Sequence, residues 1–265
     1  MADHIPQGVP HEHDGHLRVT YNDIHVLIGN TAAKIRDEFS PDLMCAIGGG
    51  GFIPARILRS FLKQGAKGEK KRNIPIQAVG LSLYEEVGFL DDDSGLAQEE
   101  KLGKEVIRTQ WLDLSTLGNR ALVGRRILIV VRFPPHESSS SDEATDCLWL
   151  LQDEVDDSRT TLEYTVRELT KDIEEHLARL SPEQRAATPP TELAIFVVHN
   201  KLKPKAGEIP AHVKYFSARH PLQHQMSSIV YTGADIEDRW VDYPWEQQDI
   251  LLHDAVAAKQ KALGL

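Results

Sequence analysis

The chain has 265 residues, of which 41% are hydrophobic and 26% charged, enough apolar material for one good core with at most a small appended lobe. Acidic residues (40) outnumber lysine and arginine (30), and the net charge of -10 argues against a general surface for nucleic acids or anionic membranes, although it is compatible with a local basic pocket. The sequence contains neither an apolar run long enough to span a bilayer nor a signal-peptide pattern. We therefore expect a cytoplasmic protein that has neither nucleic acid nor a membrane as a partner.

Residues 1–17 are polar and rich in proline, glycine and histidine, and we expect a disordered tail there, followed by a single domain at residues 18–265. The histidines of this tail are compatible with adventitious metal binding, but no cysteine or acidic partner sits at the spacing of a structural site, which favours a solvated tail. They are His4, His11, His13 and His16.

The first predicted helix covers residues 21–39, where apolar residues recur at helical spacing after an Asn-Asp start. These residues are Ile24, Leu27, Ile28, Ala32 and Ile35. A strand is predicted next, from Leu43 to Ile47. Because Cys45 lies inside this apolar run, we expect it to be a small buried hydrophobe rather than a nucleophile, and with Cys147 it gives no disulfide framework.

Four glycines, Gly48 to Gly51, join this strand to a second amphipathic helix that is predicted from Pro54. Strand, glycine turn and helix together resemble a loop whose backbone N–H groups cradle an anion. The segment is neither a Walker loop, because it lacks the Gly-Lys-Ser/Thr ending, nor a dinucleotide fingerprint, because Pro54 takes the place of the third glycine. Tight packing of the helix on the strand, without any ligand, explains the glycines equally well.

A third apolar run, Ile74 to Leu83, predicts another strand, and the segment VIRTQWLDL from Val106 predicts its partner. The acidic, glycine-containing residues 85–105 between them indicate a hairpin with a mobile, solvated tip. Further along, RRILIV and ELAIFVVHN predict strands on either side of a long amphipathic helix, TTLEYTVRELTKDIEEHLARL. This alternation predicts an α/β protein with a mostly parallel sheet that is covered by helices on both faces.

The segment DEVDDSRTT, residues 153–161, combines more acidic and hydroxyl side chains suited to binding or catalysis than any other motif considered. Hydroxyls and free amides at the start of the long helix suit a phosphate dianion, and adjacent carboxylates suit ribose hydroxyls or Mg2+. Simple N-capping of the helix by Asp or Ser is the alternative. Capping does not explain why four acids crowd into five residues just beyond a buried strand.

Together these motifs resemble a known family. DEVDDSRTT after an apolar strand is similar to the 5-phosphoribosyl-1-pyrophosphate (PRPP) signature of type I phosphoribosyltransferases. AIGGGGFIPARILRSFLK, IPIQAVGLSLYEE, KEVIRTQWLDL and DRWVDYPWE resemble, more narrowly, the fungal hypoxanthine-guanine and xanthine phosphoribosyltransferases, and the match covers most of Val19 to Asp249. The resemblance implies the type I fold with a small hood, and an enzyme that transfers the phosphoribosyl group of PRPP to a 6-oxopurine and releases pyrophosphate.

The resemblance also implies roles for individual residues. Pyrophosphate would bind Gly48, Gly49, Gly50, Gly51 and Phe52, and the ribose hydroxyls would bind Asp153 and Glu154. Asp157 would be the general base or acid at purine N7. The 5-phosphate would sit among Ser158, Arg159, Thr160 and Thr161. Mg2+ would neutralise the departing pyrophosphate, held by Asp153, Glu154 and Glu246.

For the purine, the resemblance implies stacking on Trp240, a backbone contact at Val241, and donation to the 6-oxo group by Lys203 or Lys201. Solvated lysines and simple core aromatics, Trp240 and Trp245, are the alternatives. A mobile hairpin that closes over the site would be flanked by Ser82, Leu83, Tyr84, Arg108 and Thr109. A homodimer is expected as well.

Two segments depart from the family pattern. Removing Val131 to Gln152 restores an uninterrupted ILIVDEVDDSRTT, and its residues back-translate to an intron donor, branch point and acceptor, so we hypothesise an intron translated in frame, with a genuine surface insertion as the alternative. We expect Ile127 to Val130 to be the buried central strand rather than Leu148 to Leu151, with Phe133 to Asp146 extruded as a loop. Residues 220–233 are expected to form an extra loop. An inactive PRPP-binding or regulatory protein is the alternative function.

Overall fold

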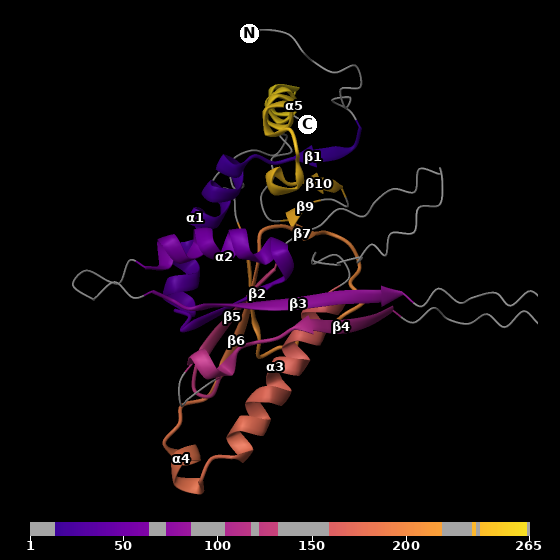
Figure 1. Cartoon of the computed structure of the whole chain (residues 1–265). Helices are drawn as coiled ribbons and strands as arrows, with labels where there is room; N and C mark the ends of the chain where they lie inside the picture. Colours follow the sequence, from indigo (N-terminus) through magenta and orange to yellow (C-terminus); the bar gives the residue numbers. More distant parts are fainter. Residues whose placement is uncertain are drawn as a thin grey trace, which may run out of the picture.

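A computed structural model describes residues 14–63, 73–85, 104–117, 122–131, 159–218, 235–236 and 239–263. Among them, six strands form one sheet in the order β4-β3-β2-β5-β6-β8 (Figure 1). All neighbouring strands of this sheet are parallel except β3 and β4, which form an antiparallel hairpin. The strands are β2 (Leu43–Ile47), β3 (Ile76–Glu85), β4 (Lys104–Gln110), β5 (Arg126–Val131), β6 (Glu192–Val197) and β8 (Lys214–Ser217).

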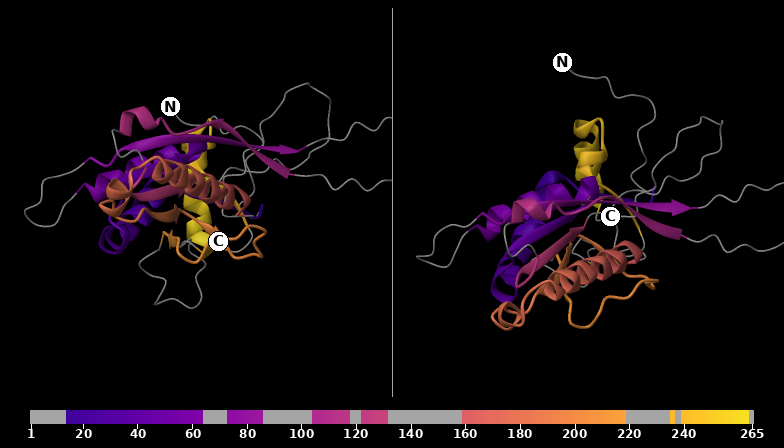
Figure 2. Two further views of the ribbon diagram at one scale, coloured as in Figure 1. Left: turned by 90° about the horizontal axis from the view of Figure 1, so that it is seen from below. Right: turned by 60° about the horizontal axis from the view of Figure 1, so that its bottom comes forward.

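Helices cover both faces of the sheet, because successive strand residues point to opposite sides. On one face, Met44 and Val130 pack with α1 (Tyr21–Glu38) and α2 (Gly48–Leu62). On the other face, Cys45 and Ile129 pack with α3 (Thr160–Ala178). The predicted α/β architecture is therefore confirmed. β3 and β4 extend past the rest of the sheet, and α3 runs beside them (Figure 2).

The predicted central strand is also confirmed. Ile127, Leu128, Ile129 and Val130 have no exposed surface, and β5 lies between β2 and β6. The competing segment, 148–151, and the expected loop, 133–146, lie outside the described residues, as does the expected loop at 220–233.

The hood is built from both ends of the chain and lies at the top of Figure 1. β1 (His16–Arg18) pairs in parallel with β10 (Trp240–Asp242), and β7 (Asn200–Lys201) pairs with β9 (Asp235–Ile236). η2 (Pro244–Glu246) and α5 (Ile250–Leu263) complete it. His16 and Leu17, the last residues of the expected tail, belong to β1, whereas residues 1–13 lie outside the described residues.

The starts of two helices differ from expectation. α2 begins at Gly48, not at Pro54: the helix includes the glycine segment, and Pro54 is accommodated inside it. The N-cap of α3 is Arg159, in a left-handed conformation with φ 67° and without a side-chain cap. The candidate caps Asp157 and Ser158 lie outside the described residues, so capping by Asp or Ser stays an alternative.

The sequence did not predict the strands β1, β8, β9 and β10, the short α4 (Pro182–Ala186) or α5. A 3-10 turn, η1 (Leu114–Leu117), follows the hairpin. None of the helices in the described ranges combines the length and apolar composition that crossing a membrane requires.

Candidate functional site

The strand order creates a switch point between β2 and β5. From β2 the chain leads through α2 to β3 on one side, whereas from β5 it leads to α3 and then β6 on the other side. In open α/β sheets, ligands bind beyond the carboxyl ends of the strands at such a point. The expected PRPP segments lie here: Gly48 follows β2 directly, and Arg159 immediately precedes α3.

The glycine segment packs very closely on the sheet. A Cβ atom on Gly51 would lie 2.6 Å from the backbone oxygen of Val130 in β5, and Gly48 has φ 58°, a conformation that favours glycine. Tight packing therefore accounts for Gly51. The first turn of α2 has no side-chain cap from Ile47, and its N–H groups lie at the carboxyl edge of β2. Phe52 is 39% exposed at this end of the helix.

The start of α3 is held by the segment that follows β7. Gly207 contacts Arg159 so closely that a Cβ there would meet the Arg159 carbonyl oxygen at 2.7 Å. The Arg159 guanidinium lies 5.3 Å from the ring centre of Tyr215 in β8, and Thr161 is only 5% exposed. Of the expected phosphate and ribose residues, Thr160, Thr161 and Arg159 are thus placed at one helix start, while Asp153, Glu154, Asp157 and Ser158 lie outside the described residues.

The expected purine residues are brought together in the hood. Lys201 is in β7 and Lys203 follows it, while Trp240 and Val241 are in β10. Val241 is buried and Trp240 is half-buried beside His16, with 5.6 Å between ring centres. The amide of Leu202 donates to the carbonyl of Ile236 at 2.7 Å, which ties the lysine segment to β9.

Trp245 packs as a core aromatic residue, which was the alternative to a role in purine binding. Its ring stacks on Tyr243 with 4.8 Å between centroids and 14° between planes, and it packs against the core cluster that contains α1 and α2. Trp240 does not belong to either core cluster of the described residues. The structure therefore separates the two tryptophans that the sequence left equivalent.

A buried histidine–tyrosine pair was missed by the sequence analysis. His199 Nδ1 and the Tyr243 hydroxyl lie 2.5 Å apart, and neither residue has exposed surface. Burial lowers the pKa of His199 to about 4, so its ring is neutral at neutral pH. The only signal in the sequence was a histidine at the end of an apolar strand, two residues before Lys201.

Cys45 is buried as predicted. Its side chain has no exposed surface, and burial raises the pKa of its thiol to about 12. A thiol with that pKa is protonated at neutral pH, and it therefore lacks the thiolate that nucleophilic attack requires.

The hairpin is confirmed, and its stem is anchored on α3. Arg108 forms an ion pair with Glu168 and lies 4.0 Å over the ring of Trp111, whose indole N–H donates to Asp172 at 2.5 Å. Arg108 thus points to a helix rather than into open solvent. The expected closure elements Ser82 and Tyr84 are in β3, and Thr109 is in β4, where it contacts Gly80. The tip, 86–103, lies outside the described residues.

No group of three or more His, Cys, Asp or Glu side chains suited to a metal occurs in the described ranges. Of the expected magnesium ligands, Glu246 is placed in η2, whereas Asp153 and Glu154 are not described.

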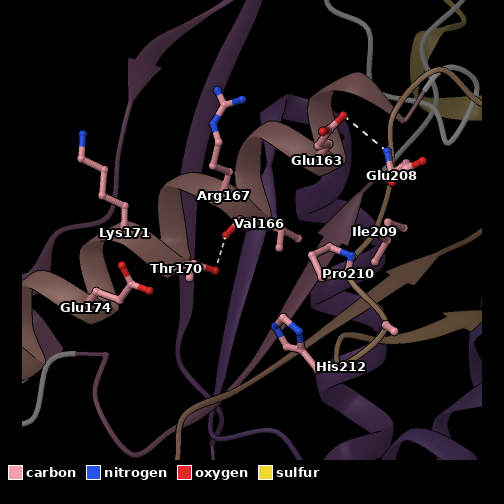
Figure 3. A pocket seen from close by; sticks show the side chains of 11 residues that line it. Glu163, Val166, Arg167, Thr170, Lys171, Glu174, Glu208, Ile209, Pro210 and His212 are labelled. Carbon is pink, nitrogen blue, oxygen red and sulfur yellow. Dashed lines mark hydrogen bonds between the residues drawn. The ribbon is translucent and has the colours of Figure 1, made fainter.

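A groove of about 760 Å3 lies on the outer surface of α3, away from these residues (Figure 3). Glu163 and Arg167 on α3 and Glu208 and His212 in the segment that follows β7 line it, and the Glu208 amide donates to a Glu163 carboxylate oxygen at 3.4 Å. None of the expected substrate residues lines this groove, so we regard it as separate from the site at the carboxyl edge.

No model of a known protein family matches the chain. It is 47% identical over 245 residues to a hypoxanthine-guanine phosphoribosyltransferase of Schizosaccharomyces pombe, covering 92% of this chain and 95% of that protein. It is 43% identical to xanthine phosphoribosyltransferase 1 of Saccharomyces cerevisiae (92% and 96% covered) and 36% identical to the hypoxanthine-guanine phosphoribosyltransferase of that yeast (91% and 90%).

Among solved structures, a Neisseria gonorrhoeae protein with bound ppGpp superimposes with a TM-score of 0.57 at 31% identity, covering 92% of this chain and 96% of that one. The extent of these matches agrees with the motifs and with the type I fold. The chain belongs to the family of the hypoxanthine-guanine and xanthine phosphoribosyltransferases.

Proposed function

We propose that the protein transfers the 5-phosphoribosyl group from PRPP to N9 of a 6-oxopurine, releasing pyrophosphate, in purine salvage. The observation that carries the proposal is that α2 and α3, which start at Gly48 and Thr160, follow the two strands β2 and β5 on either side of the switch point. Two anion-binding helix ends suit a substrate with a phosphate at one end and a pyrophosphate at the other. We further propose that the enzyme works in the cytoplasm as a homodimer.

Each of the two helix starts would bind one of the two phosphate-bearing ends of PRPP. Gly48 to Phe52 would hold pyrophosphate with backbone N–H groups, while Ser158 to Thr161 would hold the 5-phosphate. Asp153 and Glu154 would accept hydrogen bonds from the ribose hydroxyls. Fixing both polyanionic ends orients C1, which becomes oxocarbenium-like as pyrophosphate departs. Asp157 would take or share the purine N7 proton as N9 attacks.

Mg2+ fits this chemistry, because an ion bound to pyrophosphate would neutralise the charge of the leaving group. Asp153, Glu154 and Glu246 are the residues proposed to hold it. Carboxylate oxygens are the ligand type that Mg2+ prefers.

The purine would stack on Trp240, contact the backbone at Val241 and accept a hydrogen bond at its 6-oxo group from Lys203 or Lys201. Adenine should be rejected, because its 6-amino group would cover that donor without offering an acceptor, a loss of about 1 to 3 kcal/mol or more. The half-burial of Trp240 supports a stacking role, since one part of its ring surface is accessible.

Residues 131–152 bear on activity because, apart from Val131, which ends β5, they separate this strand from the proposed ribose ligands. We propose that this segment is a retained intron, and sequencing the transcript tests this: a spliced message that retains these codons would contradict it. A PRPP-binding protein without turnover is the second candidate function, favoured by this interruption alone.

The function is tested by incubating the purified chain, and the same chain lacking residues 131–152, with PRPP, Mg2+ and labelled xanthine, guanine or hypoxanthine. An enzyme forms nucleotide and pyrophosphate, whereas a binder forms neither. In the active form, Asp157→Asn should lower turnover by roughly 10² to 10⁴. An unchanged rate would remove Asp157 from the mechanism.

A further inference from the structure

Two chain segments that carry the proposed purine contacts are joined by a buried side-chain pair. His199 lies between the end of β6 and β7, immediately before Asn200 and Lys201. Tyr243 immediately follows β10, which carries Trp240 and Val241. His199 Nδ1 and the Tyr243 hydroxyl are 2.5 Å apart, although 44 residues separate them in the chain.

The pair has no route to a substrate. Both side chains have no exposed surface, and Tyr243 belongs to the core cluster under α1 and α2. The Tyr243 ring is stacked on Trp245, which in turn lies 6.0 Å from the ring of Tyr21 in α1. Any influence of this pair on the reaction must therefore pass through the residues that it holds in place.

A second tie joins the same two regions through the backbone. β7 pairs in parallel with β9, and the Leu202 amide donates to the Ile236 carbonyl at 2.7 Å. This tie sets the register of the lysine segment along β9. The side-chain pair fixes a different quantity, the separation between the end of β6 and the end of β10, because its two members follow those two strand ends.

We propose that the His199–Tyr243 hydrogen bond is a positioning device for the purine pocket, holding the Lys201–Lys203 segment at a fixed separation from Trp240 and Val241. The proposal rests on the proposed function, since it assigns these residues to the purine. A bond of this kind determines how well the base fits between a donor and a stacking ring, whereas the glycine loop at Gly48 and the phosphate cradle at Thr160 belong to α2 and α3, outside the two tied segments.

The test compares two probes on the full chain by isothermal titration calorimetry in Mg2+ buffer. GMP, IMP or XMP occupies the purine pocket and the phosphate cradle together, whereas PRPP occupies no purine pocket. Tyr243→Phe should weaken nucleotide binding roughly fivefold to 30-fold, as expected for loss of one buried hydrogen bond, and change PRPP binding less than twofold. Tyr164→Phe on α3, which also removes a single phenol hydroxyl, is the matched control and should change neither.

A double variant, His199→Phe with Tyr243→Phe, isolates the bond itself. If the bond is the unit that acts, the double variant should lose little more nucleotide affinity than either single variant. Hydrogen exchange at the Leu202 amide gives a readout that needs no ligand, and it should accelerate in Tyr243→Phe.

The possible failures are distinguishable. If neither the full chain nor the chain lacking residues 131–152 binds PRPP or nucleotide, the proposed function fails, and this inference fails with it. If the chain binds both and Tyr243→Phe binds nucleotide as tightly, only the positioning role is wrong. An equal loss of PRPP and nucleotide affinity would also overturn it, because that result indicates general destabilisation.

Discussion

Gly51 in α2 lies so close to Val130 in β5 that a Cβ atom on the glycine would come within 2.6 Å of the valine carbonyl oxygen. Val130 is the last residue before the segment that interrupts the family pattern, and Gly51 belongs to the proposed pyrophosphate loop. The contact therefore fixes the two sides of the switch point against each other through backbone atoms.

Gly51→Ala should lower the free energy of unfolding by about 1 to 3 kcal/mol, because a backbone oxygen in a central strand cannot move away from a new methyl group. Urea unfolding measures this. Gly29→Ala in α1 is the control: its Cβ would meet the tip of Phe61 at 2.9 Å, and that flexible ring can shift. Similar losses for both variants would contradict the argument.

Thr161→Val should weaken PRPP binding by about 1.5 to 3 kcal/mol, since it deletes a proposed hydrogen bond to a charged phosphate. Calorimetric titration with PRPP provides the measurement. Thr170→Val is a matched control on the same helix, where the hydroxyl instead donates to the Val166 carbonyl at 2.8 Å. Unchanged PRPP affinity in Thr161→Val would place the phosphate elsewhere.

Gly207→Ala should disturb the start of α3, because its methyl group would overlap the Arg159 carbonyl. We expect PRPP affinity to fall by roughly tenfold, which corresponds to about 1.4 kcal/mol. The neighbouring Ala206 is exposed, and Ala206→Ser should leave PRPP binding unchanged. Equal affinities for both variants would show that the loop does not support the cradle.

Arg108→Ala should loosen the hairpin stem, because the arginine both pairs with Glu168 and covers the ring of Trp111. Since its side chain is 31% exposed, we expect a loss of only about 1 kcal/mol and faster hydrogen exchange in β4. Arg167→Ala removes another arginine beside Glu168, but one that is 64% exposed, and should have a smaller effect. The reverse order would contradict the anchoring role.

The buried His199 should make stability depend on pH. Burial lowers its pKa from 6.5 to about 4, so below pH 6.5 the unfolded chain takes up a proton that the folded chain does not. Stability should therefore fall as the pH is lowered from about 6.5 to about 4, by at most about 3 kcal/mol from this residue.

His199→Gln should flatten that part of the pH profile, as measured by urea unfolding at several pH values. His212→Gln replaces an exposed histidine and should keep the original slope. Parallel profiles for His199→Gln and the unsubstituted chain would show that His199 is protonated normally when folded.

The order of the central elements followed from the sequence, because periodicity and turn residues are local properties. The helix from Tyr21 and the strands at Leu43–Ile47 and Ile127–Val130 were predicted with nearly their final bounds. The family was also recognisable, since its motifs are short, contiguous and in a fixed order.

Contacts between distant segments were decided only by the tertiary structure. α5 was missed because its buried face is half polar: Gln260 accepts from the Arg18 amide and donates to the His16 carbonyl, and His253 bonds to the Val19 carbonyl. These side chains form hydrogen bonds with backbone groups of β1 and the residue after it, which lie far away in the chain: 234 residues separate Val19 from His253. A hydrophobic pattern does not record such a role.

Contacts between distant segments also explain why the candidate site was only partly predicted. The sequence named Lys201 and Trp240 but not the His199–Tyr243 pair between their segments, because neither residue type nor spacing identifies a partner 44 positions away. It named Arg108 beside a mobile hairpin, and only the packing of β4 against α3 showed its partner, Glu168. Motifs made of neighbouring residues could be recognised from the sequence. Which distant side chains come into contact depended on how the sheet brings the ends of its strands together.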